Sequence, residues 1–414
     1  MIKYNNIYSN VIDYIASPSV KSTLYVDYLQ ILNDVCSLFY FECIKLNYSQ
    51  VLVSNLALSN IKDIHFIMSI PETFIMFMLF ILLIYSLWSY QESNKDSVID
   101  ISFGLLSINL FSFFLYLNIL SYKSYFLFNS MFLVDFYSTF SKLLFLFSSS
   151  LVMLLNLFVL NKKKSNFNRY EYPLIIGFAN LGCCLLISSY DLILFYLSIE
   201  CLSFCLYILV LLKIKNKLAA ESGLKYFCLG ALASTFMLFG IALLYGCFFT
   251  TNYLYIKTFI DNFNNQSITV YLGFLLILFG FFFKLALFPY HMTLIDVYDG
   301  SALSVTAYLI TIVKLVMVIV LCKMLMYTFY SIQFLWSPLL SFVSISSMLW
   351  GSFGALYQQR IKRFFAYSSI HQVGYITLSL AAGSSTSLFA SLFYVVVYNL
   401  TTLTTIGFNR VFRF

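Results

Sequence analysis

The sequence predicts an all-α polytopic membrane protein with about eleven transmembrane helices. Of its 414 residues, 61% are hydrophobic and only 10% are charged, whereas a soluble domain carries about 25% charged residues. Eleven stretches reach roughly the 20 apolar residues that a spanning helix needs. The basic residues also alternate between the loops that join these stretches. These patterns exclude a soluble protein and favour a chain that crosses the membrane many times.

The apolar stretches define the spans in order. The sixth is longer than a bilayer requires, so one of its ends is expected outside the lipid. Only the polar run from Ser188 to Asp191 separates the fourth and fifth spans, which predicts a tight turn with Asp191 capping the next helix. The predicted spans are residues 71–90, 99–121, 138–160, 171–190, 191–212, 218–249, 268–290, 300–326, 333–356, 364–383 and 386–408.

Residues 1–70 differ from the rest of the chain. Their charges recur too often for a span, and they are too acidic for a transit peptide. We expect interfacial amphipathic helices there, packed against the membrane part or against a partner. The chain therefore divides into four predicted parts: residues 1–70, residues 71–160 with helices one to three, residues 161–326 with helices four to eight, and residues 327–414 with helices nine to eleven.

Basic residues predict the orientation of the spans. When each loop is numbered by the span before it, the odd loops carry 13 basic residues and the even loops 3, so the odd loops are predicted to face the negative side. The seventh loop, residues 291–300, departs because it contains Asp296 and Asp299 but no Lys or Arg. Either these two carboxylates have a function in this loop, or a neighbouring protein covers the loop. The odd-loop residues are Lys95, Lys162, Lys163, Lys164, Arg169, Lys213, Lys215, Lys217, Arg360, Lys362, Arg363, Arg410 and Arg413, and the even-loop residues are Lys123, Lys257 and Lys323.

The composition argues against a redox centre in this chain. There are three histidines, His65, His291 and His371, and no two have the spacing of paired haem ligands. The nine cysteines are scattered and partly inside apolar runs, which is typical of small buried hydrophobes and not of a metal site. No glycine-rich nucleotide motif is present. We therefore expect no metal and no cofactor here. The heavy use of Phe, Tyr, Ile, Asn and Lys indicates an AT-rich genome, such as that of an organelle.

Four charged residues fall inside spans five to eight, one in each: Glu200, Lys225, Lys284 and Lys314. A charge at the bilayer centre costs about 2.5–3.5 kcal/mol on insertion scales and marks a functional hypothesis. A buried Lys holds its proton weakly and a nearby carboxylate strengthens that hold, so a Glu–Lys pair is a switchable proton site. Two structural alternatives stand beside this one. Lys225 can pair with Glu221 at the helix mouth, and Glu200 can be a protonated acid that only joins helices.

Pro289 follows Lys284 by five residues and removes a backbone hydrogen bond from an apolar helix. Broken helices mark ion sites in transporters, so a helix break beside Lys284 is predicted; the alternative is that Pro289 simply ends the span. His291 is a candidate proton relay or an interfacial side chain. His371 belongs to a polar stripe that serves either a relay or helix–helix hydrogen bonding. The stripe consists of Ser368, Ser369, His371 and Gln372.

Several of these strings resemble one known family. The segments SYDLILFYLSIECLSFCLYIL, GLKYFCLGALASTFMLFGIALLYG, FKLALFPYHMTLIDVYDGSALSVTAYLITIVKL and RIKRFFAYSSIHQVGYITLSLAAG are similar to the antiporter-like chain 2 of the proton-translocating NADH:quinone oxidoreductase, respiratory complex I. FLVDFYSTFSKLL resembles the start of that family's third helix. The resemblance covers roughly residues 71–411.

The resemblance implies a fold of 14 helices with two inverted five-helix repeats, in which the seventh and twelfth helices are discontinuous. Spans four to eight would then form a complete proton half-channel repeat and spans nine to eleven part of the second. Glu200, Lys225, Lys284 and Lys314 match the family's proton-transfer residues, and Pro289 falls at the break of helix seven.

The resemblance also implies a setting for the chain. It would be a non-redox subunit of complex I that moves protons, while flavin, iron–sulfur centres and quinone belong to other subunits. The expected location is the mitochondrial inner membrane with the odd loops on the matrix side, or a bacterial plasma membrane. Bound phospholipid is compatible with this setting, and nucleic acid is not expected. The alternative functions are a subunit of a sodium/proton antiporter complex and a structural scaffold with vestigial charges.

The chain departs from the family pattern in three places. It ends after helix eleven, so a separate polypeptide is expected to supply helices 12–14, unless the subunit keeps only a partial channel. Thr293 and Ile295 stand where the family usually has Trp and Pro. The family usually has His at the position of Gln372, whereas here the histidine is His371, about 100° around the helix.

Overall fold

The computed structural model describes residues 61–91, 96–119, 124–160, 171–212, 217–262 and 268–411. The chain divides into two units, Met1–Leu58 and Ser59–Phe414, and every described residue belongs to the second. The prediction of interfacial helices for residues 1–70 therefore falls outside the described residues, apart from residues 61–70. These ten belong to the first long helix, which begins before the predicted span.

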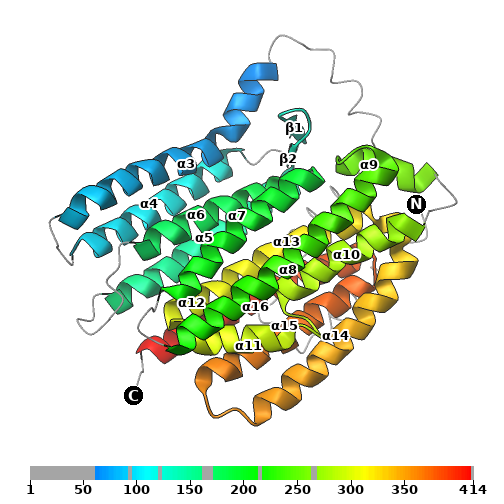
Figure 1. Cartoon of the computed structure of the whole chain (residues 1–414). Coiled ribbons are helices and arrows are strands. Elements are labelled where there is room, and N and C mark those ends of the chain that lie inside the picture. Colours follow the sequence, from blue (N-terminus) through cyan, green and yellow to red (C-terminus); the bar gives the residue numbers. More distant parts are fainter. Residues whose placement is uncertain are drawn as a thin grey trace, which may run out of the picture. The chain divides into compact units, whose positions relative to one another are not determined.

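Long helices account for the predicted spans (Figure 1). Ten of the described helical segments are long and apolar enough to cross a membrane by length and composition. The remaining predicted span, the tenth, corresponds to a further helix, α15, whose first turn carries Lys362 and Arg363. The helices that match single spans are α3 (Ile61–Gln91), α4 (Asp96–Ile119), α5 (Phe136–Leu160), α6 (Glu171–Ser188), α7 (Leu192–Leu211), α8 (Lys217–Phe248), α14 (Gln333–Leu356), α15 (Ile361–Ala381) and α16 (Ser385–Val411).

The seventh span is broken, as predicted. Helix α10 (Ile268–Leu285) ends one residue after Lys284, and α11 (His291–Gly300) begins after five intervening residues that include Pro289. Three bonds replace the regular ladder inside the break: Ala286 N donates to Phe283 O at 3.1 Å, Leu287 N to Phe282 O at 2.9 Å and Tyr290 N to Leu287 O at 2.8 Å. The predicted seventh loop is therefore wrong, because residues 291–300 form the second half of the broken helix.

The eighth span is continuous but irregular. It consists of α12 (Leu303–Tyr308), a π-helical turn at Leu309–Val313, α13 (Lys314–Lys323) and a second π-helical turn at Met324–Thr328. The most apolar stretch of this span is entirely buried by the other helices. An apolar helix that is buried on all sides lies at the centre of a bundle, so its charged residues are shielded from lipid by protein.

Short elements at the helix ends escaped the sequence analysis. A hairpin of β1 (Tyr125–Leu127) and β2 (Phe132–Val134) precedes α5, and α9 (Tyr253–Asn262) follows α8. A reciprocal cap starts α5: Ser138 N donates to Asp135 Oδ1 at 2.7 Å, and Asp135 N donates to Ser138 Oγ at 2.9 Å. Three-residue strands carry too little alternation to be recognised in an apolar background.

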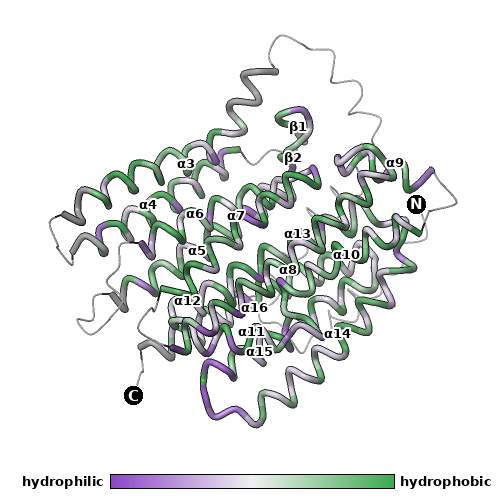
Figure 2. The backbone as a smooth tube through the Cα atoms, viewed as in Figure 1, coloured by the Kyte–Doolittle hydropathy of each residue, from purple (hydrophilic) through white to green (hydrophobic). Residues whose placement is uncertain are grey.

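Contacts between turns confirm the alternation of the spans. The second, fourth and sixth turns meet, because Tyr190 N donates to Met131 O at 2.8 Å and Leu192 N to Thr251 O at 3.0 Å. We call this the even-loop end. At the opposite, odd-loop end, the start of α8 and the turn after α14 both contact α11 through ion pairs described below. Figure 2 shows apolar residues along the helices and hydrophilic residues at turns such as that between α14 and α15. Which end faces which side of a membrane stays a prediction.

Close packing joins the helices that carry the predicted site. A Cβ atom on Gly240 of α8 would lie 2.6 Å from Gly273 O, and one on Gly273 of α10 would lie 3.0 Å from Gly240 O. Only glycine allows the two backbones to approach this closely, as small residues do at membrane helix interfaces. Helix α8 thus lies directly against α10, and α11 packs against α8 beyond the break.

Candidate functional site

Lys284 lies at the break of the seventh span. Its side chain is buried, with 7% of its surface exposed, and its Nζ atom has no hydrogen-bond partner among the described protein atoms. Nζ lies 5.6 Å from the centre of the Tyr207 ring on α7, within the range of a cation–π contact. The Lys284 ammonium is therefore buried with an aromatic face beside it and without a hydrogen-bond acceptor among the described residues.

Glu200 lies on the same face of α7 as Tyr207. The two residues are seven positions apart, and Ser203 falls between them on that face. Ser203 Oγ lies 3.4 Å from Glu200 Oε2, while Glu200 Oε1 is buried without a partner. Glu200 and Lys284 therefore do not bind each other directly, and the aromatic ring of Tyr207 contacts the lysine. Glu200 and Lys284 therefore influence each other through their charges and not through a direct bond.

Lys314 lies at the centre of the eighth span, directly after the π-helical turn at Leu309–Val313. Only 2% of its surface is exposed. Its Nζ atom donates a hydrogen bond of 2.8 Å to Ser369 Oγ on α15. Single π-helical turns are frequent at functional sites because they widen the helix locally. The sequence placed Ser369 in a polar stripe, and the structure gives this serine the contact with the central lysine.

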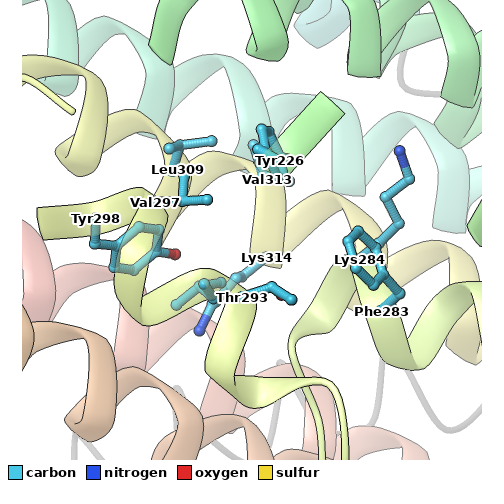
Figure 3. A pocket seen from close by; sticks show the side chains of 10 residues that line it. Tyr226, Phe283, Lys284, Thr293, Val297, Tyr298, Leu309, Val313 and Lys314 are labelled. Carbon is cyan, nitrogen blue, oxygen red and sulfur yellow. The ribbon is translucent and has the colours of Figure 1, made fainter. Parts of the chain in front are cut away.

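Lys284 and Lys314 line one cavity (Figure 3). Tyr226 of α8, together with Thr293 and Tyr298 of α11, completes its polar lining. The volume open to the centres of water molecules is about 20 Å³, which is enough for about one water. In Figure 3 the two ammonium nitrogens point in different directions. The cavity therefore joins two lysines that do not touch each other, and a water in it would bridge their surroundings.

Lys225 differs from its prediction as an interior charge. It forms ion pairs with Glu221 at 2.8 Å and with Asp296 at 3.1 Å, and 45% of its side chain is exposed. The helix-mouth alternative is thus the one observed, with Asp296 as an additional partner. The reason for the error is that α8 extends beyond the lipid-spanning length at its start, so a residue two turns into it is still at the odd-loop end.

The acid of the predicted seventh loop also has partners. Asp299 Oδ2 accepts from Arg360 Nη1 at 2.6 Å and from Arg363 Nε at 2.9 Å. Lys362 Nζ donates to Asp299 O at 3.2 Å and to Ser301 O at 2.6 Å. The unusual acidity of residues 291–300 therefore serves, at least at Asp299, to bind the basic turn between α14 and α15.

The two candidate histidines are separated. His291 begins α11 and is buried among the described residues, with its ring 5.5 Å from the Trp350 ring. His371 Nδ1 lies 3.0 Å from Met348 O on α14, which is a helix–helix contact. Gln372 faces α16 and accepts a hydrogen bond from Tyr394. The polar residues of α15 thus contact three different helices, α13, α14 and α16, and do not form one continuous row of proton relays.

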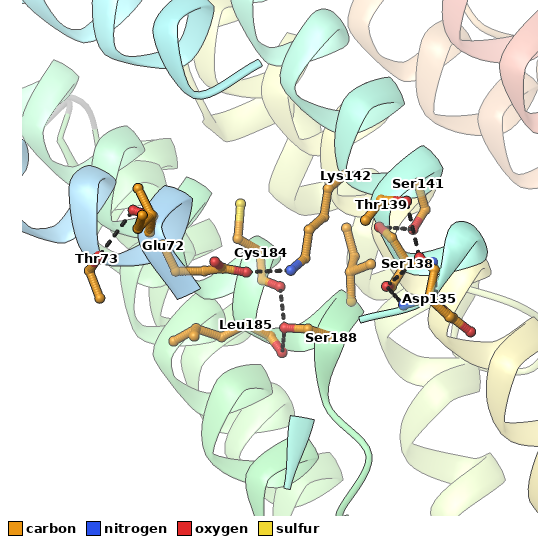
Figure 4. A network of polar contacts seen from close by, with 12 residues as sticks. Glu72, Thr73, Asp135, Ser138, Thr139, Ser141, Lys142, Cys184, Leu185 and Ser188 are labelled. Carbon is orange, nitrogen blue, oxygen red and sulfur yellow. Dashed lines mark hydrogen bonds and ion pairs between the residues drawn. The ribbon is translucent and has the colours of Figure 1, made fainter. Parts of the chain in front are cut away.

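Sequence reasoning missed a buried ion pair, between Glu72 of α3 and Lys142 of α5. Figure 4 shows the two side chains directed at each other, with Cys184 nearby. Lys142 is 1% exposed, and its Nζ lies 5.1 Å from the Tyr116 ring centre. Both residues lie near the start of their predicted spans, where a charged side chain is expected at the membrane interface. Spans one and three run in the same direction, so opposite charges at matching depth were the signal that could have found the pair.

Lys323 was assigned to an even loop, which is wrong. It ends α13 and is buried. Its Nζ donates to Ser189 O at 2.8 Å and to Ile187 O at 3.0 Å, and it lies 5.9 Å from the Tyr190 ring. These carbonyls belong to the C-terminal end of α6, where a cation is favourable. Lys323 therefore fastens the centre of the bundle to the turn between α6 and α7.

Comparisons with known proteins agree with this architecture. Residues 189–412 match the family described as "NADH:quinone oxidoreductase/Mrp antiporter, TM". NADH-quinone oxidoreductase subunit N of Paramagnetospirillum magneticum is 36% identical over 275 residues, which cover 66% of this chain and 56% of that protein. The subunit N of Pelagibacter ubique is 34% identical over 329 residues, 80% of this chain and 68% of that protein. The chain thus spans little more than half the length of the first relative.

Solved structures show the same fold. A chain of respiratory complex I from Thermus thermophilus with bound aureothin superposes with a TM-score of 0.64 at 27% identity, over 80% of this chain and 69% of that one. A chain of the Mrp complex from Dietzia gives a TM-score of 0.69 at 20% identity, over 82% of this chain and 64% of that one. At the lower identity the likeness concerns the fold alone.

Proposed function

Because the chain belongs to the NADH:quinone oxidoreductase/Mrp antiporter transmembrane family, we propose that it is a proton-translocating membrane subunit of respiratory complex I. Its named relatives are subunits of NADH-quinone oxidoreductase. In this proposal NADH oxidation and quinone reduction take place in other subunits, with their flavin and iron–sulfur groups. This chain supplies a path for protons and has no catalytic centre of its own.

The observation that carries the proposal is the cavity shared by Lys284 and Lys314. Both ammonium groups are buried in an apolar bundle, where a charge is retained only for a function or with a close partner. Lys314 has one hydrogen bond, and Lys284 has none within the described chain. In the proposed step, Glu200 holds the proton on Lys284 by its charge, and the proton passes through the cavity toward Lys314 when that influence weakens.

The partners in this proposal are the other membrane subunits of complex I. A hollow between α15 and α16 lies open at the surface, with a volume of about 540 Å³. It is lined mainly by apolar side chains of Ile361, Phe364, Phe365, Thr404, Thr405 and Phe408. Its apolar rim supports the proposal that a membrane helix from another polypeptide, or a phospholipid, covers this face. Co-purification with flavin and iron–sulfur subunits tests the assignment of partners.

The location follows from the same proposal. A multi-pass membrane protein of this family would lie in an energy-conserving membrane, with the odd loops on its negative side. The two relatives are bacterial, so the plasma membrane of a bacterium agrees with them. The mitochondrial inner membrane stays a prediction. It rests on the amino-acid composition, which indicates an AT-rich genome such as that of an organelle.

Replacement of Lys284 tests the function. In vesicles that contain the assembled complex, Lys284→Ala should abolish most proton pumping coupled to NADH oxidation, because the cavity loses one of its two proton carriers. Lys284→Arg keeps a charge but binds its proton too firmly to exchange it, so it should pump poorly as well. Normal pumping by an assembled Lys284→Ala complex would contradict the proposal and favour a scaffold.

The antiporter function remains the second candidate, because the matched family includes Mrp chains. It predicts that sodium stimulates transport and that quinone-site inhibitors do not affect it. Pumping that needs NADH and quinone, and that is indifferent to sodium, favours complex I.

A further inference from the structure

A second hollow lies at the odd-loop end, directly outside the lysine cavity. We call it the mouth hollow. Its charged lining consists of Glu221 and Lys225 of α8, Asp296 and Asp299 of α11, and Arg363 of α15. Its volume is about 110 Å³ for water centres, which is room for several waters.

The same two helices, α8 and α11, line both the mouth hollow and the lysine cavity. On α8, Lys225 lines the mouth hollow and the next residue, Tyr226, lines the lysine cavity. On α11, Asp296 lines the mouth hollow and the next residue, Val297, lines the cavity. Adjacent residues on two packed helices therefore line the two spaces, so the spaces lie at the same level of α8 and α11.

The charges of the mouth hollow differ in how firmly they are held. Asp299 is fixed by two arginines and only 15% of its side chain is exposed. Asp296 is 47% exposed and pairs with Lys225, which also pairs with Glu221. A lysine with two acceptors within 3.1 Å can release either of them by a small rotation. Either carboxylate can therefore become free, and Asp296 is the one that directly precedes a residue of the lysine cavity, Val297.

We propose that the mouth hollow is the proton inlet of the odd-loop end, and that Asp296 receives the proton there. Lys225 moves to Glu221, hydronium in the hollow transfers its proton to the freed Asp296 carboxylate, and water is left behind. Neutral Asp296 then returns the proton to a water that leads into the lysine cavity, and Lys225 pairs with Asp296 again. The step moves one proton and needs no oxidant or reductant. It rests on the proposed function, since it supplies the protons that Lys284 and Lys314 would pass on.

Charge removal at Asp296 tests the residue. In vesicles with the assembled complex, Asp296→Asn should cause a several-fold loss of proton uptake, because the amide cannot take the proton. Asp261→Asn is the matched control: it removes an exposed carboxylate of α9, at the even-loop end, and should leave uptake unchanged. Normal uptake by Asp296→Asn would overturn the proposal.

Access to water tests the hollow independently of pumping. Ser222 lines the mouth hollow, so Ser222→Cys should react with a charged, membrane-impermeant methanethiosulfonate from the odd-loop face of sealed vesicles and several-fold more slowly from the other face. Leu218→Cys lines the same hollow and is partly exposed, so it repeats the test if Ser222→Cys does not assemble. Thr235→Cys, exposed in the apolar middle of α8, should stay unlabelled, and the wild-type chain gives the background of native cysteines.

The outcomes separate the inlet from the function. Labelling of both hollow positions from the even-loop face, or from neither face, would overturn the inlet whatever Lys284→Ala does. Labelling of the hollow positions from the odd-loop face together with a loss of uptake in Asp296→Asn would support the inlet. Normal pumping by Lys284→Ala would contradict the proposed function, whatever the labelling shows.

Discussion

Lys314 and Ser369 join the centre of the bundle to α15 through a hydrogen bond of 2.8 Å. Both residues are buried, and Ser369 Oγ also donates to Ala366 O at 2.7 Å. The serine hydroxyl therefore accepts from the lysine while its own proton is occupied in its helix. Hydrogen bonds to an ionised group are roughly twice as strong as neutral ones. Ser369 thus fixes the direction of the Lys314 ammonium.

Ser369→Ala should lower coupled proton pumping without preventing assembly. It removes a bond to a charged group worth about 1.5–3 kcal/mol, which would leave the Lys314 ammonium without its acceptor and free to turn away from α15. Ser368→Ala is the matched control, since the Ser368 hydroxyl only donates to Phe365 O in its own helix. Proton uptake and NADH oxidation measured in the same vesicles check this. Equal effects of the two substitutions would contradict a specific role for Ser369.

Gly230→Ala should disturb Lys284 through Tyr207. A Cβ atom on Gly230 would lie 2.2 Å from Tyr207 Oη, so the tyrosine must move away from α8 and from the lysine whose Nζ it contacts. The expected result is a several-fold loss of pumping in a complex that still assembles. Gly246→Ala on the same helix meets no atom within 4 Å and should pump normally. If Gly230→Ala also pumps normally, the Tyr207 contact does not matter for Lys284.

The position of a charged residue along its helix was predictable from the sequence, whereas the neighbour that its side chain contacts was not. Lys284 and Lys314 were identified because apolar residues flank them on both sides in a span of ordinary length. Lys225 satisfied the same criterion, yet it lies at the helix mouth because α8 has 32 residues and extends past the bilayer. Sequence position gives the distance along a helix, and tertiary packing decides where that helix begins and which neighbour a side chain meets.

Partners distant in the sequence were the part that could not be predicted. Glu72 and Lys142 are 70 positions apart, and Asp299 and Arg360 are 61 apart. No local periodicity encodes either pair. The broken seventh helix, by contrast, was predicted because Pro289 acts on its own helix through a backbone hydrogen bond that it cannot donate. Features with a cause within one helix could be predicted from the sequence, whereas features that arise from contacts between helices could not.

Asp299→Asn should loosen the turn between α14 and α15. Arg360 and Arg363 would lose the carboxylate that both contact, so the turn would open more often. Trypsin added to the odd-loop face of sealed vesicles should then cleave after these arginines faster than in the wild-type complex. Asp261→Asn serves again as the control. Cleavage only from the opposite face would show instead that the predicted orientation of the loops is wrong.

The Glu72–Lys142 pair should behave as a buried ion pair in a double-mutant cycle. Glu72→Gln or Lys142→Met alone leaves one charge without its partner, at a cost of about 3–5 kcal/mol, so the thermal midpoint of the purified complex should fall. The double substitution removes both charges and should recover most of the loss. Glu221→Gln, which breaks an exposed pair worth about 0–1 kcal/mol, should change the midpoint little. If the double variant is as unstable as the sum of the two single ones, the two charges do not stabilise each other. The pair would then owe its presence to another role, which pumping assays on the single variants that still assemble would reveal or exclude.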